Sequence, residues 1–223
     1  MEVIASWSGG KDSCLACYKA IKDGYQIRHL LNFISREYKR SYFHGIKAEL
    51  LRAQADALGF SLVQKEVTAD LKKYEEEFKE AVNKLKAKGL KKIVFGDIYL
   101  LDHFNWVKRV CSELGVEAIE PLWNIPTDKV LRDFIEAGFK AVVVSAQAKV
   151  LGEEFIGRVV DDSLLEDLQK RKICPCGENG EFHTLVVDGP IFKKKIEITK
   201  SKPILREGFA KYWFLDIQKY KIV

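Results

Sequence analysis

The sequence contains no apolar run that reaches the roughly 18 residues needed for a membrane-spanning helix. Its first residues lack the basic segment that opens a signal peptide, so we expect no secretory leader. Cysteine occurs only five times in 223 residues, and this low, odd number argues against a disulfide framework and for a reducing compartment. We therefore expect a cytoplasmic protein without a membrane partner.

Two common phosphate-binding patterns are absent as well. The Walker A pattern G-x-x-x-x-G-K-[ST] does not fit, because Lys11 is followed by Asp12 and the first glycine is missing. The dinucleotide pattern G-x-G-x-x-G does not occur. The sequence also lacks internal repeats, low-complexity linkers and an interleaved aromatic–basic stripe, so we expect no stable nucleic-acid partner.

The composition is typical of a folded globular chain, with 47% hydrophobic and 31% charged residues. The net charge of +5 is compatible with an anionic ligand such as a nucleotide and with a nucleic-acid surface. Charge alone therefore does not decide between these ligands.

Strand and helix signals alternate through residues 1–124. Buried-strand patterns occur at residues 3–7, 27–34, 60–67, 93–97 and 116–119, and helical spacing occurs at residues 12–23, 46–58, 71–88 and 104–114. A glycine follows each helical segment, as is typical of helix C-termini. This alternation predicts an α/β fold with a doubly wound, mostly parallel sheet covered by helices on both faces.

The pattern changes near residue 124, where we place a boundary between domains at residues 1–124 and 125–223. Thr127 is a candidate cap for a helix at residues 127–137, and residues 161–172 are a second helical segment. Strands are predicted at residues 139–145, 182–187, 194–198 and 212–222. We expect a smaller α+β domain that binds the substrate and packs closely against the first domain.

The strongest chemical signal is the run SGGKDS at residues 8–13, between the first strand and the first helix. Its two glycines lack a Cβ atom, so the backbone can approach a polyphosphate closely. The helix N-terminus directs amides and a partial positive charge at a bound anion. Lys11 adds a cation, and Asp12 is placed either to cap the helix or to hold Mg²⁺ beside the phosphates.

Other segments are candidates for the same ligand. His44 follows an aromatic pair, and Asn105 and Arg109 lie four residues apart on one predicted helix face, from which both could reach phosphates. A surface role for Arg109 stays open. We predict that the ATP-binding residues are Ser6, Ser8, Gly9, Gly10, Lys11, Asp12, Ser13, His44, Gly96 and Arg109.

The run SGGKDS resembles the signature of the PP-loop, or N-type, ATP pyrophosphatases. The resemblance implies a HUP-type domain of the adenine-nucleotide α-hydrolase kind and cleavage of ATP between its α- and β-phosphates. In that chemistry a substrate carbonyl oxygen attacks the α-phosphate. A nucleophile, often ammonia or a sulfur donor, then displaces AMP.

A second string, CGENGEFHTLVVDGPIF at residues 176–192, resembles the C-terminal signature of the diphthine–ammonia ligases. The segments SYFH (41–44), GDI (96–98) and EPLW (120–123) are similar to the same family in the same order. The resemblance implies ATP-dependent amidation of diphthine, a modified histidine on translation elongation factor 2, through an adenylated carboxylate. ATP and Mg²⁺ are the implied cofactors, ammonium is the nitrogen source, and a homodimer is left open.

The turn GENGE at residues 177–181 presents two carboxylates before a strand, where they could hold a cationic group or act as a general base on ammonium. A role as solvated turn residues also stays open. Asp97 ends a predicted strand on the ligand side of the sheet. From there it could orient the target, hold a metal or cap the next helix. We predict that the catalytic residues are Asp12, Asp97, Glu178, Glu181 and His183, with no dedicated set of metal ligands.

The cysteines leave alternatives open. Cys14 and Cys17 lie three residues apart on the first helix, which favours core positions over a zinc site shared with Cys174 and Cys176. Cys111 is also predicted to lie in a helix core. The Cys174–Cys176 pair supports a tRNA-modifying PP-loop enzyme, either a thiolase or a lysidine-type ligase, as the main alternative. A sensor that binds ATP without cleaving it is the third hypothesis.

Overall fold

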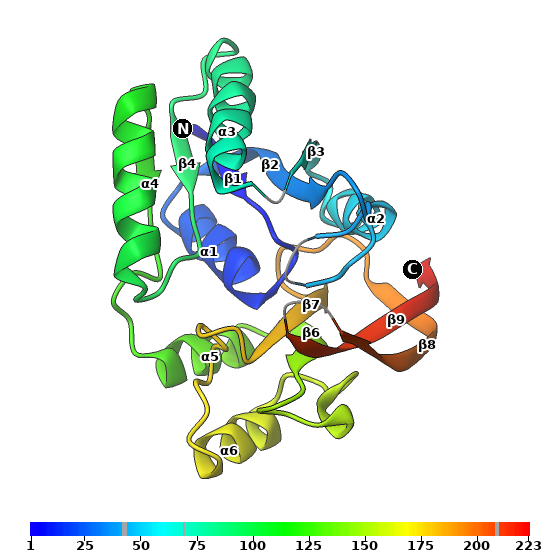
Figure 1. The fold of residues 1–223 in the computed structure, drawn as a ribbon. Coiled ribbons are helices and arrows are strands. Elements are labelled where there is room, and N and C mark those ends of the chain that lie inside the picture. Colours follow the sequence, from blue (N-terminus) through cyan, green and yellow to red (C-terminus); the bar gives the residue numbers. More distant parts are fainter. Residues whose placement is uncertain (42–43, 69, 208–209) are drawn as a thin grey trace.

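The computed structural model describes residues 1–41, 44–68, 70–207 and 210–223, and within them the chain forms one parallel and one antiparallel sheet (Figure 1). The strands of the parallel sheet are β1 (Glu2–Ser6), β2 (Gln26–Ser35), β3 (Ser61–Val67), β4 (Lys92–Val94) and β5 (Glu117–Ile119). Their spatial order is β3-β2-β1-β4-β5. The strand order therefore reverses between β1 and β4, and open α/β sheets bind ligands at such a switch point.

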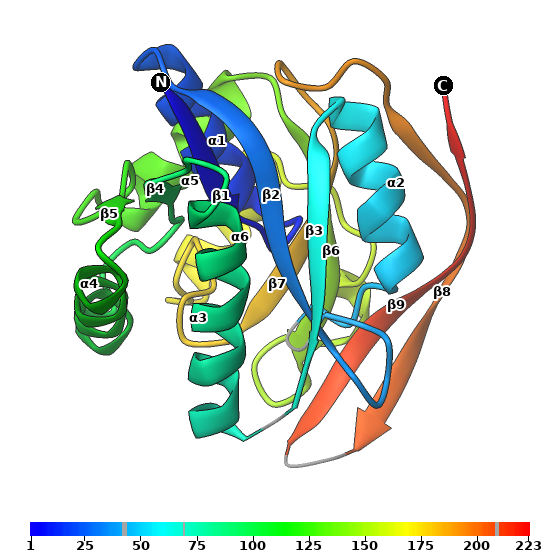
Figure 2. The ribbon, with the colours of Figure 1, turned by 90° about the horizontal axis from the view of Figure 1, so that it is seen from above.

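Helices cover both faces of the parallel sheet, which confirms the predicted doubly wound arrangement (Figure 2). These helices are α1 (Lys11–Lys22), α2 (Ala48–Leu58), α3 (Leu71–Lys86) and α4 (Leu101–Leu114). Because side chains alternate along a strand, Val3 of β1 packs with α1 and α2, whereas Ile4 packs with α3 and α4. Gly59 and Gly115 end α2 and α4 in the left-handed conformation, as the sequence predicts.

The later residues form the predicted α+β unit around the antiparallel sheet. Its strands are β6 (Lys140–Gln147), β7 (Phe182–Asp188), β8 (Ile196–Glu207) and β9 (Lys211–Ile222), in the order β7-β6-β9-β8; its helices are α5 (Thr127–Glu136), α6 (Asp162–Lys170) and the short 3-10 helix η1 (Glu153–Phe155). Strand β6 is buried on both sides, because Val143 packs toward α5 and α6 and Val144 packs toward α2. The boundary at residue 124 stays a prediction.

The side chain of Gln54 joins the two sheets. It is fully buried in α2, and its Nε2 donates to the carbonyl oxygens of Gly9 (2.9 Å) and Val186 (2.7 Å). Its Oε1 accepts a hydrogen bond from Trp7 Nε1 at 3.0 Å. The amide of Val186 also donates to the Gly9 carbonyl at 3.0 Å. The loop after β1 is therefore fixed against β7.

Strand β4 ends at Val94, earlier than the predicted end at residue 97. The reason is a close approach of two backbones. A Cβ atom on Gly96 would lie 3.0 Å from the carbonyl carbon of Asp12 and 3.1 Å from the amide nitrogen of Ser13. The chain after β4 thus turns against the start of α1, and Asp97 is carried to the phosphate loop.

The three residues that the sequence offers as candidate helix caps do not occupy cap positions. The N-cap of α5 is Pro126, with Thr127 as the first helical residue, and proline suits a helix start because it lacks an N–H. Asp12 lies in the first turn of α1, whose N-cap is Gly10. Leu100 occupies the N-cap of α4, so Asp97 does not cap that helix. The aspartates are therefore free of a capping role.

Strand β8 is longer than predicted and runs to Glu207, because β9 pairs with it along its whole length. The polar segment around Pro203 gives no strand pattern, but proline is tolerated at a sheet edge. The aromatic pair Tyr42 and Phe43 lies outside the described residues. Within the ranges that are described, no helix is both long and apolar enough to span a bilayer.

We predict that Gln54→Ala lowers the free energy of unfolding by about 2–4 kcal/mol, because it leaves several buried polar groups without their partner. Chemical denaturation measured by circular dichroism tests this. The matched control is Gln218→Ala, an exposed amide on β9, which should change stability by less than about 0.5 kcal/mol. Equal stabilities of the two variants would contradict the role of Gln54 as the joint.

Candidate active site

The phosphate loop has a backbone that glycine alone accommodates. Gly9 adopts a φ of +82°, and a Cβ atom there would lie 2.6 Å from both Gln54 Oε1 and Leu51 Cδ2. Gly10 faces the opposite side, where a Cβ atom would lie 2.8 Å from His44 Nε2. The loop is therefore packed between α2 and the histidine, and glycine is required by its backbone conformation at Gly9.

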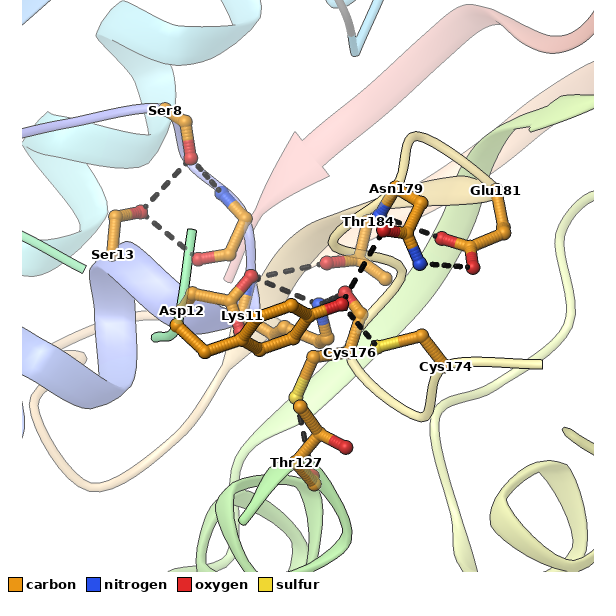
Figure 3. A network of polar contacts seen from close by, with 12 residues as sticks. Ser8, Lys11, Asp12, Ser13, Thr127, Cys174, Cys176, Asn179, Glu181 and Thr184 are labelled. Atoms are coloured by element: carbon orange, nitrogen blue, oxygen red, sulfur yellow. Dashed lines mark hydrogen bonds and ion pairs between the residues drawn. The ribbon is translucent and has the colours of Figure 1, made fainter. Parts of the chain in front are cut away.

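The loop serines bond to one another and to the backbone (Figure 3). Ser8 Oγ accepts from the Gly10 amide at 3.2 Å and lies 3.2 Å from Ser13 Oγ. Ser13 Oγ donates to the Gly10 carbonyl at 3.0 Å. Ser6 ends β1 just before this loop. The structure thus brings the predicted residues 6–13 together at the N-terminus of α1.

Lys11 is the buried cation of the site. Its Nζ lies 2.9 Å from Asp12 Oδ2 and donates to the carbonyl oxygen of Cys176, while its backbone amide donates to Thr184 Oγ1 at 3.0 Å. The ammonium also lies 5.3 Å from the centre of the Phe182 ring. Burial opposes the charge, but Asp12, Cys176 and Glu178 together outweigh it, and the pKa of Lys11 is raised. The ammonium therefore stays charged at neutral pH.

Three carboxylates interact around Lys11. Burial and the nearby charge of Asp97 raise the pKa of Asp12. The charge of Lys11 lowers this pKa, but the net shift is upward. Burial and the repulsion of Asp12 raise the pKa of Glu178 to about 7. Asp97 Oδ1 lies 3.6 Å from His103 Nδ1, and the nearby carboxylate raises the pKa of the imidazole. A carboxyl group that titrates near neutrality inside a charged cluster is typical of an active site.

The donor set fits Mg²⁺ that is shared with phosphate oxygens. Asp12 Oδ1 is buried and has no hydrogen-bond partner among the residues that the structure describes. Mg²⁺ is commonly bound through one or two carboxylates together with substrate phosphates. Within the described ranges, no group of three or more His, Cys, Asp or Glu side chains forms a metal cage. Asp12, with Asp97 or Glu178 nearby, is therefore suited to a nucleotide-bound ion.

Two imidazoles form the wall beside Gly10. The ring centres of His44 and His183 are 4.6 Å apart. Burial lowers the pKa of His44 well below its usual range, and burial together with Lys11 lowers the pKa of His183 to about 4. Both rings are therefore neutral at pH 7, and each can donate and accept a hydrogen bond. The structure places His44 beside the loop, and its role in binding ATP stays a prediction.

The predicted site residues Glu181 and Arg109 have other partners. The oxygens of Glu181 accept the backbone amide and the side-chain amide of Asn179, at 2.9 and 3.0 Å, so this carboxylate closes the turn. Arg109 pairs with Glu75 and, at 2.9 Å, with Glu113 on the outer side of α3 and α4. The structure does not bring Arg109 to the phosphate loop, and its guanidinium is already paired. These contacts fit the surface role that the sequence analysis left open for Arg109.

The sequence did not reveal some of the groups that support the loop. Thr184 lies within the second string, but nothing in the string shows that its hydroxyl accepts the Lys11 amide. Gln54 occupies an ordinary helical position, and a buried amide there has no local signal. For Cys176 the sequence drew attention to the thiol, whereas the backbone carbonyl is the group that contacts Lys11.

The cysteines are distributed as the core interpretation predicts. Cys14 and Cys17 are fully buried in α1, and Cys111 is buried in α4. Cys176 Sγ donates to the Thr127 carbonyl at 3.2 Å, and burial raises the pKa of its thiol. Tyr99 Oη donates to Cys174 Sγ at 3.9 Å. The buried thiols are therefore poor thiolate nucleophiles.

Comparisons with known proteins cover both parts of the chain. The sequence matches a family model described as the diphthamide synthase N-terminal domain over residues 1–118 and one described as its C-terminal domain over residues 126–223. A solved structure described as a predicted subunit of tRNA methyltransferase from Methanocaldococcus jannaschii covers 87% of this chain and 99% of its own, but the TM-score of 0.44 at 19% identity is too low to support an argument.

Curated relatives named diphthine–ammonia ligase align along nearly the whole chain. The Rattus norvegicus protein is 30% identical over 94% of this chain and 87% of its own, and the Mus musculus protein is 29% identical over 98% and 91%. The Schizosaccharomyces pombe protein is 25% identical over 98% of this chain. The match covers only 39% of the length of that relative. Matches over both halves show that the chain belongs to the diphthamide synthase family.

Proposed function

We propose that this protein amidates diphthine on translation elongation factor 2, using ATP and ammonium and releasing AMP and pyrophosphate. The observation that carries the proposal is the buried Lys11–Asp12 pair at the start of α1, with Glu178 in electrostatic contact. Cation, carboxylate and helix N-terminus together provide a site for an ATP polyphosphate. The names of the relatives support diphthine as the acceptor. A cytoplasmic setting and a homodimer stay predictions.

The loop is proposed to hold the ATP phosphates. The glycines let the backbone approach, the hydroxyls of Ser8 and Ser13 donate, and Lys11 neutralises charge on the leaving pyrophosphate. Asp12 would hold Mg²⁺, which screens the phosphate charge when the substrate carboxylate attacks the α-phosphate. These interactions favour formation of an adenylated carboxylate.

Glu178 is proposed as the general base for the nitrogen donor. A carboxylate near the reaction centre attracts ammonium, and with a pKa of about 7 it can remove a proton when ammonium approaches. The neutral ring of His183 can then donate a hydrogen bond to the developing oxyanion. Ammonia attacks the carbonyl carbon, the bond to the AMP oxygen breaks, and the nitrogen releases a second proton to solvent as the amide forms.

We predict that Asp12→Asn lowers ATP-to-AMP turnover by at least about a hundredfold, because a carboxylate aimed at the phosphates is lost. AMP assay and intact mass spectrometry of diphthine-bearing elongation factor 2 measure the effect. Asp102→Asn, an exposed aspartate in the first turn of α4, is the control and should retain full turnover. Undiminished turnover in a correctly folded Asp12→Asn variant would contradict the proposed ATP site.

The raised pKa of Glu178 predicts a pH dependence. The base works when deprotonated, so kcat/KM should rise with pH through about 7 and level off above it. The measurement should keep free ammonia constant, because ammonia itself becomes more abundant as pH rises. Glu178→Gln should lose at least tenfold in kcat/KM and lack the rise near pH 7. An unchanged profile in this variant would assign the titration to another group.

The tRNA-thiolase alternative makes the opposite prediction for cysteine. The proposed amidation uses no thiol, and serine can replace the hydrogen bond from Cys176 to the Thr127 carbonyl. We predict that the Cys174→Ser/Cys176→Ser variant keeps its amidation rate within about twofold. Mass spectrometry of the elongation factor measures this rate. Loss of activity in a folded variant would favour sulfur chemistry.

A further inference from the structure

The positive charge of the chain is concentrated in its C-terminal segment. Residues 193–223 contain nine Lys or Arg and three Asp or Glu, a net charge of +6, whereas the whole chain carries +5. Residues 1–192 are therefore close to neutral, with a net charge of −1. This segment contains the paired strands β8 and β9, which we call the C-terminal hairpin.

The basic side chains of the hairpin face solvent. Lys200, Lys202 and Arg206 of β8 are exposed, and none of them makes an ion pair within the part of the chain that the structure describes. In contrast, exposed lysines of α3 pair within their own helix, as Lys84 does with Glu80. Strands β8 and β9 carry six Lys or Arg against Glu197, Glu207 and Asp216, a net charge of +3, so the hairpin attracts an acidic surface that approaches it.

The backbone of β8 is also available. Strand β8 lies at the end of the order β7-β6-β9-β8 and pairs with β9 on one side. It spans 12 residues, which corresponds to about 40 Å of extended chain. Such an edge presents N–H and C=O groups that a partner can bond. Figure 2 shows β8 and β9 as a long arm at the margin of the molecule.

The hairpin is connected to the active site. Tyr212 Oη of β9 donates to the Gly180 carbonyl at 3.3 Å, in the turn that carries Glu178. The Lys211 carbonyl accepts the Ala148 amide at 2.9 Å. A protein that lies along the hairpin therefore reaches the turn of the carboxylates at one end of the arm.

The surface fits a protein better than a nucleic acid. Single-stranded RNA is bound by exposed aromatic rings combined with basic groups. On β9 the rings of Tyr212, Trp213 and Phe214 are half-buried, and Phe214 lies against Gly45. These rings are thus only partly available for stacking, whereas charge and a free strand edge suit an acidic protein surface.

We propose that the C-terminal hairpin is the docking surface for the protein that carries the side chain to be amidated, and that the matching face of this partner is acidic. The inference rests on the proposed function, because a modified side chain on a large protein requires contacts beyond the catalytic turn. Docking through exposed charges accelerates association and is weakened by salt.

The test compares two variants with the same change in charge. Lys200→Glu/Lys202→Glu reverses charge on the hairpin, and Lys88→Glu/Lys91→Glu reverses it at exposed positions between α3 and β4. With diphthine-bearing elongation factor 2, the hairpin variant should raise KM at least tenfold with kcat within twofold. The control should stay within twofold in both constants. The difference in KM between the two variants should shrink when salt is raised from about 50 to about 300 mM, because a shorter Debye length screens exposed charges more strongly.

Each outcome decides the docking proposal separately from the chemistry. Equal KM values in both variants, with normal wild-type turnover, would overturn docking and leave the proposed function intact. If wild type does not modify the factor, the proposed function fails, and direct binding of the factor to immobilised protein decides docking. Loss of factor binding in the hairpin variant alone supports it. Unchanged factor binding, or hairpin-dependent binding of a polyuridine RNA in preference to the factor, overturns it.

Discussion

The structure depends on how the ammonium of Lys11 is held away from water. A buried cation is costly unless it is paired, and here Asp12 supplies the charge while the carbonyl of Cys176 supplies a hydrogen-bond acceptor. The same residue also binds Thr184 through its backbone amide. The phosphate loop, the turn before β7 and β7 itself are therefore arranged around one charge. Substituting Lys11 would leave Asp12 buried without its counter-ion, so stability and chemistry are coupled at this position.

The remaining carboxylates respond to the same charge balance. The charge of Asp12 is largely balanced by Lys11. Glu178 is buried nearby, and because its pKa is raised to about 7 its protonated form is favoured below that pH. The two groups are of the same chemical type but differ in environment, and this difference separates a role at the phosphates from a role in proton transfer. The histidines on the other side of Gly10 are kept neutral by burial and add no positive charge.

Periodicity and glycine positions were sufficient for the elements of the parallel sheet, because each strand and helix carries its own local pattern. They were not sufficient for β8, whose polar residues become a strand only through pairing with β9. The phosphate loop could be predicted because its chemistry lies in six consecutive residues. Gln54 and the Cys176 carbonyl could not, since their roles depend on contacts across 45 and 165 positions. For Arg109 helical spacing did not reveal which partner an exposed cation meets, and the structure pairs it with Glu75 and Glu113.

The contacts between Lys11 and residues 176–184 have a consequence for biosynthesis. The groups that complete the loop are made more than 160 residues after the loop itself. Contacts so distant in sequence are slow to form, since a long segment must be ordered before they are gained. The nascent N-terminal half therefore emerges with a loop whose lysine is still solvated. The loop therefore reaches its final conformation only after residues 176–184 have left the ribosome.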